Sequence, residues 1–404
     1  MDGGGGGSPS LIDPVVKLNA IRGFGAAYEA FAKADPGTAE DKLLVEVKKH
    51  PLVKRAEKTG KGELWAELKD GSYWTYVGNR LVSATKPPLP PSELQGQTRV
   101  SLPTSERAAV FCSLGDDQSF IEPGIKLAPQ IKGAGYQLVG GTHLTGSVYD
   151  YLALSDIGLL YVDSHGSQFA GRTFYSVFTS TEATEEVVKD MGRRLAFMDY
   201  TISTMSIGKP KPGQPKTKQV ISLTSQWFAK SKFLKPGSLV FLNTCHGGAN
   251  PIVTALNKVG VGLHLGWSWS SSDEKANLAS HRFFDLTLNN AGGWQHWADA
   301  VNTMEGEGLT VDGAPYGVGA LFVAAAGKDP ADHLLPVIKE VSEDAALGRY
   351  ILKGVFGSTR GVIFENGDKN KKLDVISWTP NEVRVTAKAS TSSVTAAVGE
   401  RKSQ

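Results

Sequence analysis

The chain has 404 residues, of which 41% are hydrophobic and 21% are charged, and its formal net charge is +2 at pH 7. These values are typical of a globular protein that is long enough for two or three domains. A charge this close to zero creates no broad field that would attract nucleic acid, and no apolar run reaches the roughly 18 residues of a membrane-spanning helix. We therefore expect neither a nucleic-acid partner nor a membrane span.

The two cysteines, Cys112 and Cys245, are too few for a disulfide framework, which suits a reducing compartment. The first residues lack the basic and then apolar pattern of a signal peptide. The chain is expected to be cytoplasmic if Met1 is the native start, and secreted or on the cell surface if a signal has been removed. Cys112 lies in the apolar run 108–114, so we expect it to be a buried small hydrophobe.

The N-terminal part is predicted to be a flexible glycine-rich tail at 1–9, followed by a small α+β region at 10–91 that ends in a proline-rich linker. Asp13 and Pro14 are typical of the start of a helix. The pair 70–71, Asp-Gly, separates two alternating segments and predicts a β-hairpin. Nothing here carries catalytic chemistry, so we interpret the region as a pro-region or docking domain.

Strand-like apolar runs alternate with helix-like stretches over residues 99–330, which predicts a mainly parallel sheet flanked by helices. Active sites of such folds lie beyond the carboxyl ends of the strands. Two of the apolar runs are followed directly by polar residues. The run 157–162 is followed by Asp-Ser-His-Gly at 163–166, and the run 239–242 is followed by Asn-Thr-Cys-His-Gly at 243–247.

Short strand-like segments with turn residues between them fill 334–398, the spacing of a small β-sandwich. Residues 399–404 are expected to fray. The predicted fold class is therefore α/β, with a small α+β N-terminal region and a C-terminal β-sandwich.

Cys245 and His165 are the candidate catalytic pair. A thiolate is the nucleophile of cysteine peptidases, and a neighbouring imidazole both stabilises it and later protonates the leaving amine. The backbone N–H groups of Gly166 and Cys245 are the candidate donors of the oxyanion hole. The pattern predicts a cysteine endopeptidase that acts on a protein or peptide substrate without a cofactor.

Two other interpretations remain open. The chain would be a catalytically inactive scaffold or adhesion protein if its cleft and sandwich only bind a partner. A metal site would draw its ligands from Cys245, His246, His165 and His264, but the paired spacing of zinc fingers or zincins is absent, so we predict no metal.

The order of the two motifs resembles the caspase-like (clan CD) cysteine peptidases, which include caspases, metacaspases, gingipains, clostripain, separase and CHAT-domain peptidases. The resemblance covers residues 107–326. The segment 262–273, which leads into a helix with an aromatic pair, looks most like the CHAT, gingipain and clostripain side. The caspase pentapeptide around Cys245 is absent, so the resemblance does not imply aspartate specificity.

The resemblance also implies substrate-binding positions. Asn243, two residues before Cys245, stands where the S1 pocket is commonly lined. Asp116 and Asp117 follow the first strand and are candidates to pair with a basic P1 side chain, or else to cap the next helix. Asp163 is a further acidic candidate, for the substrate or for orienting the dyad. The predicted wall of the S2 pocket comprises Trp267, Ser268 and Trp269. The alternative interpretation is that the two tryptophans belong to the hydrophobic core.

Segments 336–342, 354–357, 362–367 and 376–385 carry a second resemblance. On these segments, the C-terminal part 334–398 resembles an IPT/TIG immunoglobulin-like module, a kind of sandwich that binds protein or glycan partners or acts as a spacer.

The basic loop 209–218 is a candidate autoprocessing site if the P1 residue is basic. The enzyme would be a zymogen that is held latent by the N-terminal region or matured by clipping.

Overall fold

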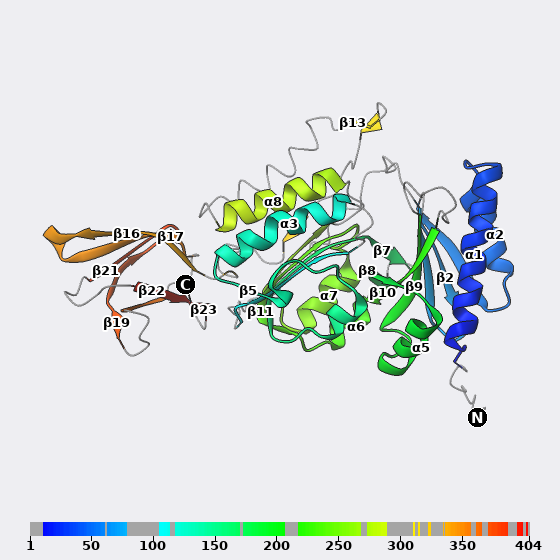
Figure 1. The fold of residues 1–404 in the computed structure, drawn as a ribbon, viewed down its shortest axis with the longest axis horizontal. Coiled ribbons are helices and arrows are strands. Elements are labelled where there is room, and N and C mark those ends of the chain that lie inside the picture. The colour runs from blue at the N-terminus through cyan, green and yellow to red at the C-terminus, as the bar shows by residue number, and fades with distance from the viewer. Residues whose placement is uncertain are drawn as a thin grey trace, which may run out of the picture. The chain divides into compact units, whose positions relative to one another are not determined.

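The computed structural model divides into two compact units, one of Met1–Ser83 and Gly166–Phe228 and the other of Ala84–His165 and Ala229–Gln404 (Figure 1). No helix among the described residues has both the length and the hydropathy of a membrane span. The residues that the structure describes are 11–60, 63–78, 105–113, 118–169, 173–206, 217–267, 273–288, 310–311, 314–315, 322–324, 334, 336–356, 361–365, 371–386, 394–398 and 401–402.

The first unit is built on a seven-stranded sheet in the order β1-β2-β3-β9-β10-β8-β7. β3 runs parallel to β9, and the other neighbouring strands are antiparallel. The strands are β1 (Val53–Gly60), β2 (Glu63–Leu68), β3 (Tyr73–Val77), β7 (Gly166–Phe169), β8 (Phe174–Glu182), β9 (Tyr200–Ser206) and β10 (Thr217–Thr224).

The first helix, α1 (Pro14–Ala34), begins where the sequence predicted. Asp13 accepts hydrogen bonds from the backbone N–H groups of Val15 and Val16, and Pro14 is the first residue of α1. The carboxylate of Asp70 organises the β2–β3 hairpin by accepting from the Ser72 backbone and hydroxyl. Both predictions are confirmed. The helices are α1 (Pro14–Ala34), α2 (Ala39–Lys49) and α5 (Glu185–Arg194), with α6 (Ser225–Lys230) directly after β10.

The division of the chain differs from the expected one. The sequence predicted 10–91 as a region of its own and 166–228 as part of a domain at 99–330, but β3 and β9 pair in one sheet. The physical reason is that strands far apart in the chain can pair in one sheet, and local sequence patterns do not say which distant strand pairs with β3.

The second unit contains a six-stranded sheet in the order β15-β12-β11-β6-β4-β5. β15 is antiparallel to β12, and the other pairs are parallel. This mainly parallel sheet flanked by helices is the arrangement that the sequence predicted. The strands are β4 (Arg107–Cys112), β5 (Gln137–Leu138), β6 (Ile157–Asp163), β11 (Leu234–Asn243), β12 (Leu263–Trp267) and β15 (Phe322–Ala324).

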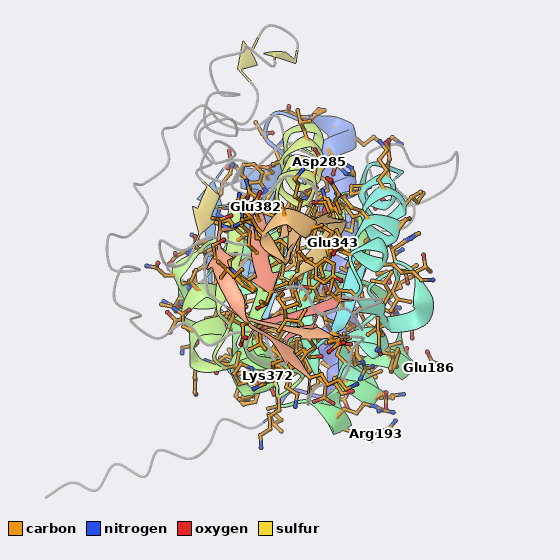
Figure 2. All side chains as sticks on the ribbon, turned by 90° about the vertical axis from the view of Figure 1, so that its left-hand side faces the viewer. Glu186, Arg193, Asp285, Glu343, Lys372 and Glu382 are labelled. Atoms are coloured by element: carbon orange, nitrogen blue, oxygen red, sulfur yellow. The ribbon has the colours of Figure 1, made fainter. Side chains whose placement is uncertain are left out.

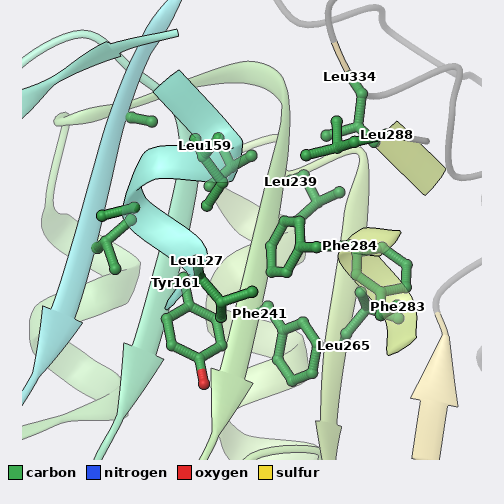
Figure 3. Close-up of a cluster of buried hydrophobic side chains, with 14 of the residues drawn as sticks. Leu127, Leu159, Tyr161, Leu239, Phe241, Leu265, Phe283, Phe284, Leu288 and Leu334 are labelled. Atoms are coloured by element: carbon green, nitrogen blue, oxygen red, sulfur yellow. The ribbon is translucent and has the colours of Figure 1, made fainter. Parts of the chain in front are cut away.

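Helices cover both faces of this sheet, α3 (Gln118–Gly133) and α8 (Asp273–Leu288) one face and α7 (Asn250–Lys258) the other (Figure 1). All seven residues of β6 are buried, as expected for a parallel strand between two helical layers. Figure 3 shows the side chains between the sheet and α8, among them Leu239, Phe241, Leu265, Phe283 and Phe284. This packed core holds the strand ends that carry the candidate site. The shorter elements are α4 (Val148–Leu152), η2 (Val139–Gly141), β13 (Thr310–Val311) and β14 (Ala314–Pro315).

The C-terminal strands form the predicted β-sandwich of two antiparallel four-stranded sheets, β16-β17-β21-β20 and β19-β18-β22-β23. Leu352 and Val383 of one sheet share a core with Ile363 and Ala396 of the other. The bounds are β16 (Val337–Asp344), η4 (Ala345–Leu347), β17 (Arg349–Val355), β18 (Val362–Glu365), β19 (Lys372–Leu373), β20 (Val375–Trp378), β21 (Glu382–Thr386), β22 (Val394–Val398) and β23 (Arg401–Lys402).

β23 lies within 399–404, where the sequence predicted a frayed end, because Arg401 and Lys402 find antiparallel partners in β22. Three other predicted features lie outside the described residues. They are the glycine-rich tail 1–9, the proline-rich linker 86–91, and most of the basic loop, at 209–216.

Candidate active site

The register of β6 and β11 places the two candidate catalytic residues at the same edge of the sheet. Asp163 is paired with Asn243 across these parallel strands. His165 lies two residues beyond Asp163, and Cys245 lies two residues beyond Asn243. Because adjacent strands are about 4.8 Å apart, the turn that carries His165 and the turn that carries Cys245 leave the sheet side by side and at the same level.

Burial singles out the same two residues. Ser164 and Thr244 are 3% and 1% exposed, whereas His165 and Cys245, which follow them, are only half-buried. The imidazole and the thiol are therefore the side chains that reach the surface at these two strand ends. A catalytic pair needs this accessibility to meet a substrate.

The second cysteine is unsuited to be the nucleophile. Cys112 ends β4, opposite Asp163, and is 1% exposed. Burial, helped by the negative charge of Asp163, raises the pKa of the Cys112 thiol far above its ordinary value. A thiol in such surroundings stays protonated and inert. The expectation that Cys112 is a buried small hydrophobe is confirmed.

Three glycines let the loop that carries Cys245 pack directly on the end of β12. The Gly248 N–H donates to the Trp267 carbonyl at 2.8 Å, and the Gly247 N–H donates to the Thr244 carbonyl at 2.9 Å. A Cβ on Gly248 would lie 2.6 Å from the carbonyl oxygen of Gly266, and a Cβ on Gly266 would run into the Gly247 backbone. This backbone-to-backbone packing holds the thiol in place.

Two further histidines lie beneath this loop. His246, next to the thiol, is 1% exposed and has a left-handed φ of 59°. His264, on β12, is 1% exposed, and burial lowers its pKa to about 3, while a hydrogen bond with the Gly247 backbone acts in the opposite direction. His264 is therefore neutral near pH 7 and supports the loop backbone. Within the described ranges, no group of three or more His, Cys, Asp or Glu residues could hold a metal ion.

A chain of hydrogen bonds joins the ends of three strands below His165 and Cys245. Trp267 Nε1 donates to Asn243 Oδ1 at 2.9 Å, Asn243 Nδ2 donates to the Tyr161 hydroxyl at 3.1 Å, and that hydroxyl donates to Asp163 Oδ2 at 3.4 Å. All four side chains are buried. Burial, together with the charge of Asp163, raises the pKa of Tyr161 well above its ordinary value, so the phenol remains a donor. We call these four residues the strand-end network.

The strand-end network changes the interpretation of three predicted substrate contacts. Asp163, Asn243 and Trp267 are 3%, 2% and 0% exposed, so the structure places them under the two turns and not on an open surface. Trp267 belongs to the core, which was the alternative interpretation for the tryptophans. Tyr161 was not among the predicted site residues, although its position two residues before Asp163 puts both side chains on one face of the strand.

Among the other predicted site residues, only Gly166 lies within the part of the chain that the structure describes. Asp116, Asp117, Ser268 and Trp269 lie outside the described residues. Gly166 is the first residue of β7 and is paired with Val177 of β8. Its predicted role as an oxyanion donor, with the N–H of Cys245, stays a prediction.

No protein-family model matches the chain, and no curated protein matches it. Three solved structures are similar over 74% of this chain. One is described only as a protease, with 12% identity and a TM-score of 0.33 over 66% of that chain. Another is the complex of the pro- and mature domains of RgpB from Porphyromonas gingivalis, with 11% identity and a TM-score of 0.34 over 67% of that chain.

The third is the Arg-specific cysteine proteinase gingipain R (RgpB), with 10% identity and a TM-score of 0.31 over 65% of that chain. The chain thus spans about two thirds of the length of these neighbours. None of the three is described as a CHAT or IPT/TIG protein, so those two finer resemblances stay predictions.

Proposed function

We propose that this protein is a cysteine endopeptidase in which Cys245 is the nucleophile and His165 the general base and acid. The observation that carries the proposal is the pairing of Asp163 with Asn243, which starts both turns from one level of neighbouring strands. The half-buried state of the thiol and the imidazole supports the same assignment.

The chemistry follows from the two side chains. His165 takes the proton of the Cys245 thiol, and the thiolate attacks the carbonyl carbon of the scissile peptide bond. The oxyanion that forms needs backbone N–H donors, for which we propose Gly166 and Cys245. The imidazolium then protonates the leaving amine, and water hydrolyses the thioester with His165 as the base.

The finer assignments form part of the same proposal. A preference for basic P1 residues would rest on Asp116 and Asp117. The enzyme would be held latent by the N-terminal region or matured by clipping, for which 209–218 is the candidate autoprocessing site. The sandwich at 334–398, an IPT/TIG-like module, would bind a protein or glycan partner.

An activity-based probe tests the dyad. An acyloxymethyl-ketone peptide should label the wild-type protein and the Cys112→Ala control, but neither Cys245→Ala nor His165→Ala. Peptide cleavage should follow the same order. A Cys245→Ala protein that still cleaves peptides would overturn the proposal, and a folded wild type that is neither labelled nor active would favour the inactive scaffold.

Specificity is tested separately on a peptide library that varies the P1 residue. Neutralising both acidic candidates, as Asp116→Asn with Asp117→Asn, should abolish cleavage after Arg and Lys while probe labelling of Cys245 persists. An unchanged P1 preference would reject the role of the two carboxylates and leave the dyad assignment intact.

A further inference from the structure

The first unit contains a cavity of about 560 Å³, and neither residue of the dyad is part of its lining. The start of α1, the end of α5 and the segment leading into β9 surround it. The walls are mainly apolar, with Leu11, Pro14, Leu195 and Phe197 among them. The volume lies within the roughly 300–1,000 Å³ of small-molecule sites. An inference about this cavity does not depend on the proposed peptidase activity.

The floor of the cavity holds a buried ion pair whose carboxylate is saturated. Asp70 Oδ2 lies 2.9 Å from Lys17 Nζ and accepts from the Ile12 N–H at 3.2 Å. Asp70 Oδ1 accepts from the Ser72 N–H at 3.0 Å and from the Ser72 hydroxyl at 2.6 Å. Asp70 is fully buried, so a ligand finds no free acceptor on it.

Two side chains on the wall can donate a further hydrogen bond. The Lys17 ammonium carries three N–H donors, and its one partner among the described residues is Asp70, although the side chain is only 10% exposed. The Tyr200 hydroxyl, on a residue 9% exposed, has no hydrogen-bond partner within the described ranges. Burial, aided by the charge of Asp70, raises the pKa of Tyr200 to about 12, so the hydroxyl keeps its proton.

The charged side chains around the cavity favour a negatively charged ligand. Its lining includes Lys17, Lys189 and Arg193, against one carboxylate, Asp70. Arg193 extends from the outer surface of α5 (Figure 2). The ion pairs of Lys189 and Arg193, with Glu185 at 3.7 Å and Asp190 at 3.2 Å, are exposed and therefore weak. The net positive lining favours an anion.

We propose that this cavity binds a small amphipathic carboxylate. The apolar body would lie against Leu195 and Phe197, and the carboxylate would accept hydrogen bonds from Lys17 Nζ and the Tyr200 hydroxyl. This arrangement gives the Tyr200 hydroxyl an acceptor and the Lys17 ammonium a second one, and it leaves the Lys17–Asp70 pair intact.

Isothermal titration calorimetry of the full chain with decanoate, below its micellar concentration, tests the proposal. We expect one decanoate per chain, binding more tightly than decanol, decyltrimethylammonium or acetate. Decanol that binds equally well would overturn the role of the carboxylate, and so would the cationic surfactant. Equal binding of acetate would overturn the role of the apolar walls, and the absence of decanoate binding would overturn the site.

Two variants locate the binding. Tyr200→Phe removes only a hydroxyl without a partner, so the fold should persist while decanoate affinity falls roughly tenfold. Gly192→Leu adds a side chain near Pro14 and the Tyr200 hydroxyl and should block the cavity. Tyr28→Phe, outside the cavity, is the matched control. Unchanged affinity in folded Tyr200→Phe and Gly192→Leu proteins would show that decanoate binds elsewhere and would refute the proposal.

Discussion

Asn243 lies opposite Asp163 in the register of β11 and β6, and both side chains are hydrogen-bonded to the hydroxyl of Tyr161. Pairing of the two backbones sets the level at which each strand ends, and the shared phenol ties the two ends together. His165 and Cys245, each two residues further along, therefore start from positions that the sheet has already aligned.

The strand-end network should be sensitive to loss of its central amide. Asn243→Leu would leave the Trp267 Nε1–H without its acceptor and the Tyr161 hydroxyl without one of its donors, both buried. An unsatisfied buried group costs about 1–3 kcal/mol, so we expect the free energy of unfolding to fall by roughly that amount. Peptide cleavage should lose kcat with little change in KM, because the strand ends move and no substrate contact is removed.

Urea unfolding and steady-state kinetics check this outcome, with Asn257→Leu on the partly exposed side of α7 as a control. A rise in KM alone would instead show that Asn243 contacts substrate, as the resemblance to caspase-like peptidases implied.

The packing of glycine on glycine beneath Cys245 predicts a second outcome. A Cβ at Gly266 would meet the Gly247 backbone, so Gly266→Ala must displace the loop or strain it. We expect stability to fall by about 1–3 kcal/mol and probe labelling of Cys245 to slow markedly. Gly133→Ala, where a Cβ meets nothing within 4 Å, should leave both unchanged. Wild-type labelling by Gly266→Ala would contradict the role assigned to this contact.

His264 makes stability depend on pH. Its pKa is about 3 in the folded protein and about 6.5 without the protein environment, so the unfolded chain takes up this proton first as the pH falls. The lowered pKa of His264 contributes fully to the free energy of unfolding above pH 6.5. This contribution is lost as the pH falls towards 3, at up to about 1.4 kcal/mol for each pH unit. Chemical unfolding between pH 7 and 4.5 should show a shallower loss for His264→Asn than for the wild type. Parallel curves would rule out a buried neutral imidazole.

Two glycines of α1 offer a matched pair for stability. Gly23 is exposed in the helix interior, and a Cβ there meets nothing within 4 Å. Gly23→Ala should therefore increase the free energy of unfolding by about 0.5–1 kcal/mol and raise the melting temperature. At Gly25 a Cβ would lie 2.8 Å from Gln219 Nε2 and 3.1 Å from Thr217 Oγ1, which in turn is bonded to Glu29. Gly25→Ala should gain nothing, and a larger gain there than at Gly23 would contradict this packing.

The sequence alone predicted much of the local structure. The start of α1 at Pro14, the hairpin around Asp70, the parallel strands that end at Asp163 and Asn243, and the C-terminal sandwich were all expected and are present. These features depend on neighbours in the chain, such as a capping carboxylate or the length of an apolar run, so short patterns contain them.

Other features required the tertiary structure, because they depend on contacts between residues far apart in the chain. The pairing of β3 with β9 moved segment 166–228 into the sheet of the N-terminal strands. The burial of Trp267 and its hydrogen bond to Asn243 place this tryptophan in the core, which was one of the two interpretations of its residue type.

For the candidate site, the sequence by itself determined which two residues could react, since a thiol and an imidazole each follow an apolar strand. Only the tertiary structure decided that β6 and β11 are neighbours in a register that pairs Asp163 with Asn243. The reason is that strand order and register arise from hydrogen bonds and packing between distant segments, whereas the residue types at a strand end are a property of that strand alone.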